Sequence, residues 1–109
     1  MIILPVTGPV IQEPSPHHQG IDQACLLGSE VRAMGNGYGR FHWSRDMGWV
    51  FTQETFVGTI SISHLHYKGV DGFYQAGQVV SQCGSTGRLS RGPHVHVEGP
   101  PVINSFFGL

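Results

Sequence analysis

The 109-residue chain has few charged side chains, few cysteines and no long apolar run. Charged residues make up 12% of the sequence and the formal net charge is -1, so no basic surface points to nucleic acid or a membrane as a partner. The N-terminal stretch 1–6 is too short and lacks the basic residues of a secretory signal. We therefore expect no nucleic-acid partner, no membrane span and no visible signal peptide.

The two cysteines, Cys25 and Cys83, are too few to form a disulfide scaffold. Neither belongs to a Cys-x-x-Cys motif, so the sequence indicates no cysteine zinc site and no redox pair of that type. Each lies in an apolar or glycine-rich stretch. We expect two small buried thiols rather than a bridge, although the sequence leaves a bridge open.

Glycine and proline, by contrast, are abundant. Sixteen glycines and seven prolines predict many turns and argue against long helices. Segments 49–54 and 59–65 read as a pair of short strands. We predict an all-β fold in which an antiparallel sheet forms the core. Glycine-rich loops at 35–47, 66–77 and 84–92 should wall an open groove.

The length of 109 residues fits a single domain with a modest core. Residues 1–16 are rich in proline and are expected to form a loop-like lead-in. Residues 17–98 hold the patterned segments and are expected to form the core that carries the chemistry. Residues 99–109 form an apolar tail that either packs back or meets an assembly partner.

The strongest local pattern is a pair of histidines, His94 and His96, that follows a Gly-Pro turn. Side chains two residues apart on a strand point to the same face, so the two imidazoles stand side by side. Glu98 continues that face, and the valines between these residues face the other way. Neutral imidazole is the commonest metal ligand and a ready general base. The pair predicts a metal site or a catalytic pair, and the pattern leaves open which histidine does which.

A second polar group, His18 and Asp22, flanks Gly20. Pro14 and Pro16 exclude a helix here, but a turn at Gly20 could bring both side chains to one point. Taken alone, this segment is typical of a polar surface turn. Together with one histidine of the later pair, it supplies two imidazoles and a carboxylate, which is the kind of set that holds a catalytic zinc with one position open.

A third candidate, His64, ends the apolar face of the predicted strand 59–65, after Ile60 and Ile62. The simplest interpretation is a buried histidine with a hydrogen-bond partner. The functional interpretation is that the strand ends at the site and delivers His64 to it. His66 shares that face but lies beyond the strand end, and it is the weaker candidate.

With these residues placed, the sequence resembles the lysostaphin/LytM-type zinc endopeptidases, which cut peptide bonds in bacterial peptidoglycan. Each matching block is weak alone, but together they occur in the order typical of that family. The blocks are His18-Gln19-Gly20-Ile21-Asp22, Gly28-Ser29-Glu30-Val31, Ser63-His64-Leu65, Ala76-Gly77-Gln78-Val79-Val80, and Gly84-Ser85-Thr86-Gly87-Arg88 followed by Gly92-Pro93-His94-Val95-His96-Val97-Glu98.

The resemblance implies that His18, Asp22 and His96 hold Zn²⁺, while His64 and His94 assist the attacking water and the developing oxyanion. It also implies that peptidoglycan is the partner and that the protein acts on the bacterial cell wall, whether outside the cell, in the periplasm or on a virion. A phage virion or lysis component would fit.

Two alternatives differ in chemistry. A zinc D-Ala-D-Ala carboxypeptidase or dipeptidase also uses a His/Asp/His set, although the spacing of the blocks fits it poorly. A non-catalytic cell-wall-binding module or structural phage component would carry only a vestigial site. All five site positions are intact, which argues against the second alternative.

Overall fold

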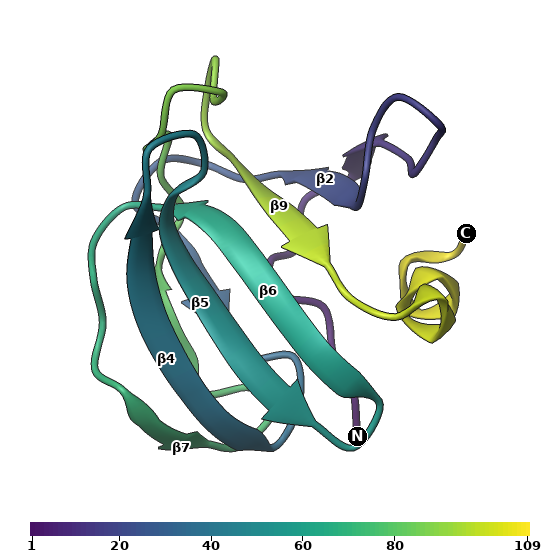
Figure 1. Ribbon diagram of the computed structural model, residues 1–109, viewed down its shortest axis with the longest axis vertical. Helices are drawn as coiled ribbons and strands as arrows, with labels where there is room; N and C mark the ends of the chain where they lie inside the picture. The colour runs from purple at the N-terminus through teal and green to yellow at the C-terminus, as the bar shows by residue number, and fades with distance from the viewer.

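The computed structural model describes residues 1–109, and most of its strands form one antiparallel sheet of seven strands (Figure 1). The strands of this sheet are β1 (Val10–Gln12), β2 (Ile21–Ala24), β4 (Gly37–Ser44), β5 (Gly48–Thr55), β6 (Gly58–Leu65), β7 (Gly72–Tyr74) and β9 (His94–Glu98). Their order across the sheet is β1-β2-β9-β6-β5-β4-β7. Two more strands, β3 (Glu30–Arg32) and β8 (Val79–Gln82), form a separate small sheet. The all-β prediction is confirmed.

The hydrophobic core lies against one face of the large sheet. Inward-facing residues of β5, β6 and β9 supply its centre, and Val31 and Val80 of the small sheet pack into the same cluster. Along β9, Val95 and Val97 are fully buried, as the alternation predicts. The opposite face of β4, β5, β6 and β9 has no helix over it (Figure 1). One face of the sheet is therefore left open for a site.

Several segments predicted as loops contain strands. Residues 37–44 form β4, although 35–47 was predicted to be a groove wall, and β7 lies within the predicted loop 66–77. Glycines hide the alternation in β4, and one of them is required by packing. A Cβ at Gly39 would lie 2.2 Å from the ring of Phe51. The predicted lead-in 1–16 likewise contains the short edge strand β1.

The C-terminal segment packs back onto the molecule. It forms a 3-10 helix, η1 (Pro101–Phe107), in which Ile103 is 2% exposed and joins the core. Figure 1 shows η1 beside the end of β9, at the edge of the large sheet. No helix in the molecule has the length and apolar character needed to cross a membrane.

A disulfide joins Cys25, just after β2, to Cys83, just after β8. The expectation of two unpaired thiols was therefore wrong. The residues around each cysteine indicate only whether that cysteine is buried. Whether the two form a bridge depends on the distance between them in the folded protein. The two Cα atoms lie 6.1 Å apart, within the range that a disulfide spans.

Candidate metal centre

The candidate site is centred on two residues that face each other across the neighbouring strands β2 and β9. Asp22 pairs directly with His96, so the two side chains project from the same face of the sheet. Asp22 Oδ1 lies 2.8 Å from His96 Nδ1, and both residues are buried. A carboxylate and an imidazole are thus held together on the open side of the sheet by backbone pairing alone.

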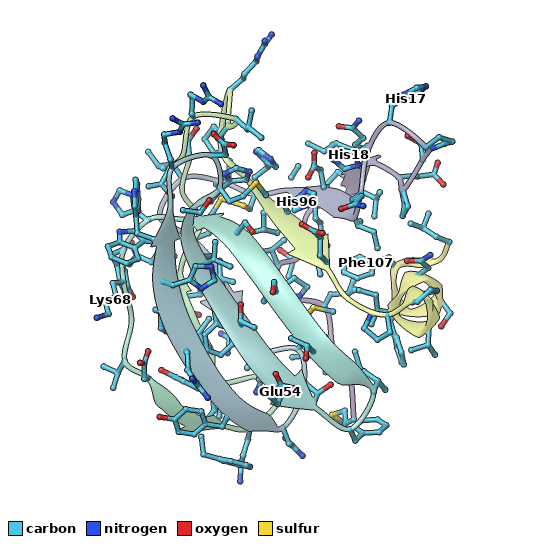
Figure 2. All side chains as sticks on the ribbon, in the orientation of Figure 1. His17, His18, Glu54, Lys68, His96 and Phe107 are labelled. Atoms are coloured by element: carbon cyan, nitrogen blue, oxygen red, sulfur yellow. A yellow bond between two sulfur atoms is a disulfide. The ribbon has the colours of Figure 1, made fainter.

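A turn before β2 adds the third side chain. Gly20 has a φ of 85°, and a Cβ there would lie 2.5 Å from the Val97 carbonyl oxygen and 2.9 Å from His96 Nε2. Only glycine lets the chain pass this close to β9 in that conformation. The turn brings His18 Nε2 to 3.2 Å from Asp22 Oδ2. Figure 2 shows His18 and His96 close together where the turn meets β9, and their ring centroids are 5.2 Å apart.

This set fits a zinc ion. One ligand atom from each of His18, Asp22 and His96 can be chosen so that all three lie within 4.8 Å of one another. Ligands at zinc-bonding distance in a tetrahedron are about 3.3 Å apart, close to the 3.2 and 2.8 Å contacts seen here. Two imidazole nitrogens and one carboxylate are donors that zinc accepts, and three protein ligands leave a fourth position for a reactant.

The negative charge of Asp22 and the positive charge of a protonated His96 stabilise each other. Burial alone would raise the pKa of Asp22, but the hydrogen bond with His96 and the charges of the nearby histidines outweigh burial, and the pKa lies below its usual 3.8. Burial alone would lower the pKa of His96, yet Asp22 and Glu98 hold that pKa above 6.5. Asp22 is therefore ionised at neutral pH, and a proton competes with a metal ion for His96.

His64 and His94 lie beside this set, with ring centroids 4.7 Å apart. His64 Nδ1 is 2.7 Å from the Thr86 carbonyl oxygen, and His94 Nδ1 is 2.8 Å from the Gly92 carbonyl oxygen. A carbonyl can only accept, so Nδ1–H donates in both rings, and each neutral ring keeps a bare Nε2 as an acceptor. Burial lowers the pKa of His64, although the bond to Thr86 opposes the shift. His64 is therefore neutral at pH 7.

His64 reaches the site by a route that alternation does not predict. Ile62 and Leu65 both face the core, a step of three residues where regular alternation allows only even steps. The β5–β6 register shifts at this point, and His64 adopts a φ of 65°. This bulge turns His64 away from the isoleucine face and towards His94. The structure thus places His64 beside His94 at the end of β6, whereas strict alternation would have turned its side chain into the core.

Other histidines lie away from the set. His66 is exposed, and the nearest aromatic ring to it is that of Tyr67, at 6.5 Å between centroids. His17 and His42 are also exposed. The structure therefore gathers His18, His64, His94 and His96 around Asp22 and leaves the remaining histidines in solvent.

No family model matches the chain, and no curated protein is significantly similar to it. Solved structures do match. A Pseudomonas aeruginosa protein assigned to the M23 peptidases superposes with a TM-score of 0.76 at 28% identity, over 89% of this chain and 43% of that one. The catalytic domain of the antimicrobial peptidase lysostaphin from Staphylococcus simulans matches with a TM-score of 0.66 at 27% identity, over 83% of this chain and 72% of that one. The chain is similar in fold to the lysostaphin/LytM-type peptidases.

A zinc containing peptidase from Vibrio cholerae shares the fold, with a TM-score of 0.78 at 23% identity over 88% of this chain and 35% of that one. This chain thus spans less than half the length of the Pseudomonas and Vibrio proteins.

Glu98 contacts the His96 ring on the side away from Asp22. Its Oε2 lies 3.0 Å from His96 Nε2, the nitrogen that points away from Asp22. A carboxylate on the remote nitrogen of a ligating histidine fixes the ring orientation and increases its basicity. The alternating pattern placed Glu98 on the correct face but could not separate this role from that of an ordinary surface glutamate.

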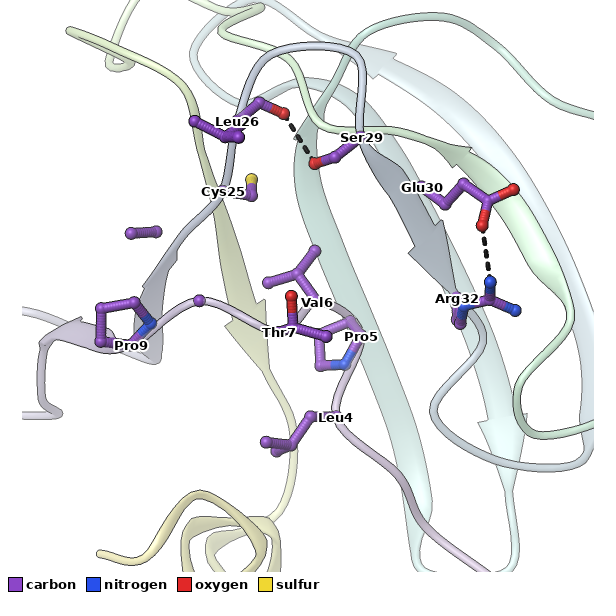
Figure 3. Close-up of a pocket in the computed structure, with 12 residues that line it drawn as sticks. Leu4, Pro5, Val6, Thr7, Pro9, Cys25, Leu26, Ser29, Glu30 and Arg32 are labelled. Carbon is purple, nitrogen blue, oxygen red and sulfur yellow. Dashed lines mark hydrogen bonds and ion pairs between the residues drawn. The ribbon is translucent and has the colours of Figure 1, made fainter.

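Two pockets lie on the surface of the molecule, and only one of them adjoins the site. A groove of about 410 Å³ lies between the turn before β2 and η1, and His18 and Glu98 line it. The C-terminal segment therefore forms one wall, which the loop prediction did not include. A second pocket of about 470 Å³ lies between residues 4–9 and the start of β3 (Figure 3). The Glu30–Arg32 ion pair borders it, and none of the site histidines lines it.

Proposed function

We propose that the protein is a zinc-dependent endopeptidase that hydrolyses peptide bonds in the stem peptides or cross-bridges of bacterial peptidoglycan. The observation that carries this proposal is the convergence of His18, Asp22 and His96 beside two imidazoles with free Nε2 atoms. Likeness to a lysostaphin catalytic domain supports the choice of substrate.

In this proposal His18 Nε2, an Asp22 oxygen and His96 Nδ1 hold the zinc. Zinc in such a site acts as a Lewis acid that polarises a carbonyl group and makes water more acidic. Glu98 accepts a hydrogen bond from His96 Nε2 and keeps Nδ1 directed at the ion. Residues 17–98 would then make up the catalytic core.

His64 and His94 would move the protons. One of them would accept a proton from water at its Nε2 and become an imidazolium. The other, with a second proton on its own Nε2, would donate that proton to the oxyanion or to the leaving amine. Both rings are suited to the accepting part, because both hold their Nδ1 proton on a backbone carbonyl and leave Nε2 as the acceptor. His94 Nε2 lies 3.8 Å from Asp22 Oδ1, which places this ring next to the ligand set.

The test is digestion of purified sacculi and of defined muropeptides by the zinc-loaded protein, with mass analysis of the products. We expect an internal peptide bond to be cut, and the cut to disappear after zinc is removed with a chelator. Release of terminal D-alanine alone would favour the carboxypeptidase alternative. Binding to sacculi without any cleavage would favour a non-catalytic module of the cell wall or of a phage particle.

A further inference from the structure

His64 has an unusual backbone. It is the one non-glycine residue with a positive φ, at 65°, and it stands in the bulge between β5 and β6. A residue with a Cβ adopts this conformation only when its surroundings impose it. The neighbours that hold His64 in place therefore decide where its ring points.

A single threonine contacts the bulge from the loop after β8. The Thr86 hydroxyl donates to the Leu65 carbonyl at 2.6 Å and accepts from the Trp49 N–H at 3.2 Å. It thus joins the last residue of β6 to the start of β5 where the register shifts. The carbonyl of the same residue accepts the hydrogen bond from His64 Nδ1 at 2.7 Å. Thr86 therefore holds both the backbone next to His64 and the ring itself.

Glycines on both sides let this loop come so close. Gly48 has a φ of 71°, and a Cβ there would lie 2.1 Å from Thr86 Oγ1. Gly87 has a φ of 90°, and a Cβ there would lie 2.3 Å from the Gly48 nitrogen. The Arg88–Asp46 ion pair, at 2.9 Å, fastens the far side of the loop. These contacts bring the loop close to the bulge, and the two bonds of the Thr86 hydroxyl then fix the position of its own carbonyl.

We propose that Thr86 is a positioning residue that keeps His64 in its Nδ1–H tautomer, with Nε2 free of hydrogen. The hydroxyl acts through its own carbonyl, because it fixes the position of that carbonyl relative to the bulge. Without the hydroxyl, the carbonyl shifts and the ring can place its proton on Nε2 instead. The effect on catalysis rests on the proposed function, whereas the effect on the tautomer does not.

The chain offers a matched control in Thr55. Its hydroxyl makes the same two kinds of bond, donating to the Gly58 carbonyl at 2.8 Å and accepting from the Val57 N–H at 3.3 Å. These bonds stabilise the turn that connects β5 to β6, at the opposite end of the hairpin from the bulge. Thr55→Val thus removes an equivalent pair of hydrogen bonds without touching His64.

The experiment compares Thr86→Val, Thr86→Ser and Thr55→Val as zinc-loaded proteins. The readouts are zinc content, the His64 tautomer from imidazole ¹⁵N NMR, and kcat and KM on peptidoglycan. We expect Thr86→Val to keep its zinc, to show Nε2–H at His64, and to lose kcat by about 10²-fold with little change in KM. Thr86→Ser restores the hydroxyl and should resemble the original protein, as should Thr55→Val.

A pure Nδ1–H tautomer in Thr86→Val would overturn the proposal. Thr86→Ala is a second hydroxyl-free variant and carries the test if the valine variant does not fold. The two proposals fail separately. If the tautomer changes while both Thr86→Val and His64→Ala hydrolyse normally, the positioning role stands and the role of His64 in the proposed function is wrong.

Discussion

Asp22 and His96 show how one residue pair governs the site. Their cross-strand pairing puts a carboxylate 2.8 Å from an imidazole in a buried position, and Glu98 contacts the other nitrogen of that ring. These carboxylates raise the pKa of His96 against the effect of burial. The same contacts that would orient a metal ligand therefore also bind a proton tightly in its place.

This predicts a pH-dependent effect of Glu98→Gln on the metal-free protein. The folded pKa of His96 lies above 6.5, so the stability that its carboxylate partners confer is fully present below pH 6.5 and is lost as the pH rises through the folded pKa. The difference in unfolding free energy between the original protein and Glu98→Gln should be largest near pH 6 and shrink above it.

Urea unfolding at a series of pH values measures this difference. Glu54→Gln is the control, because Glu54 accepts a hydrogen bond from Thr59 and lies well away from His96 on the same sheet (Figure 2). Its effect should not follow the titration of His96. A Glu98→Gln effect that grows as the pH rises would contradict the proposed coupling.

The histidines beside the ligand set allow a second prediction at this scale. His64→Ala and His94→Ala should keep close to normal zinc while peptidoglycan cleavage falls by about 10²–10⁴-fold, the usual cost of losing a general acid or base. His66→Ala should lose far less, because His66 is exposed and apart from the set. Zinc content and sacculus hydrolysis should be measured on the same preparations. An inactive His66→Ala variant with an active His64→Ala variant would mean that the wrong histidine was chosen.

At the scale of elements, sequence patterns predicted β5, β6 and β9 and missed β4 and β7, which lie in segments predicted as loops. The β5–β6 pair and β9 follow from their side-chain order. β4 did not, because its glycines remove the alternation, although Gly39 is required by the ring of Phe51. The bulge at His64 was also beyond prediction, because it depends on bonds from Thr86, which lies 22 residues away.

The disulfide is likewise a tertiary feature. Cys25 and Cys83 are 58 residues apart in sequence, and only the fold brings their Cα atoms within bonding range. A cross-link over a loop of that size is worth about 4 kcal/mol in the chain-entropy model, and such bridges commonly deliver 2–4 kcal/mol. We expect the Cys25→Ala/Cys83→Ala double variant to lose stability within that range.

Chemical unfolding of the double variant checks this expectation, with the original protein under a strong reductant as the companion sample. Both should unfold at similarly lowered denaturant concentrations. Full stability in the double variant would show that the bridge contributes nothing to the folded protein. Disulfides persist in oxidising compartments, so the bridge is compatible with the proposed action at the cell wall.

At the scale of the whole molecule, the order of short sequence blocks carried more information than any single pattern. The blocks that contain the site histidines meet beside β2, β6 and β9. The blocks at 28–31 and 76–80 lie in or next to the small β3–β8 sheet instead. The contribution of η1 to the groove wall could not be predicted, because the apolar sequence of the tail does not indicate which surface it packs against. The groove beside His18 and Glu98 owes one wall to that tail.

The central claim is that three side chains hold a zinc ion on which hydrolysis depends. The most direct measurement is a zinc titration of metal-free protein, with bound zinc and sacculus hydrolysis followed together. The account predicts that hydrolysis rises with bound zinc and levels off at about one ion per chain, and that Asp22→Ala neither retains zinc nor recovers activity. Full hydrolysis by the metal-free protein, or undiminished zinc in Asp22→Ala, would contradict it.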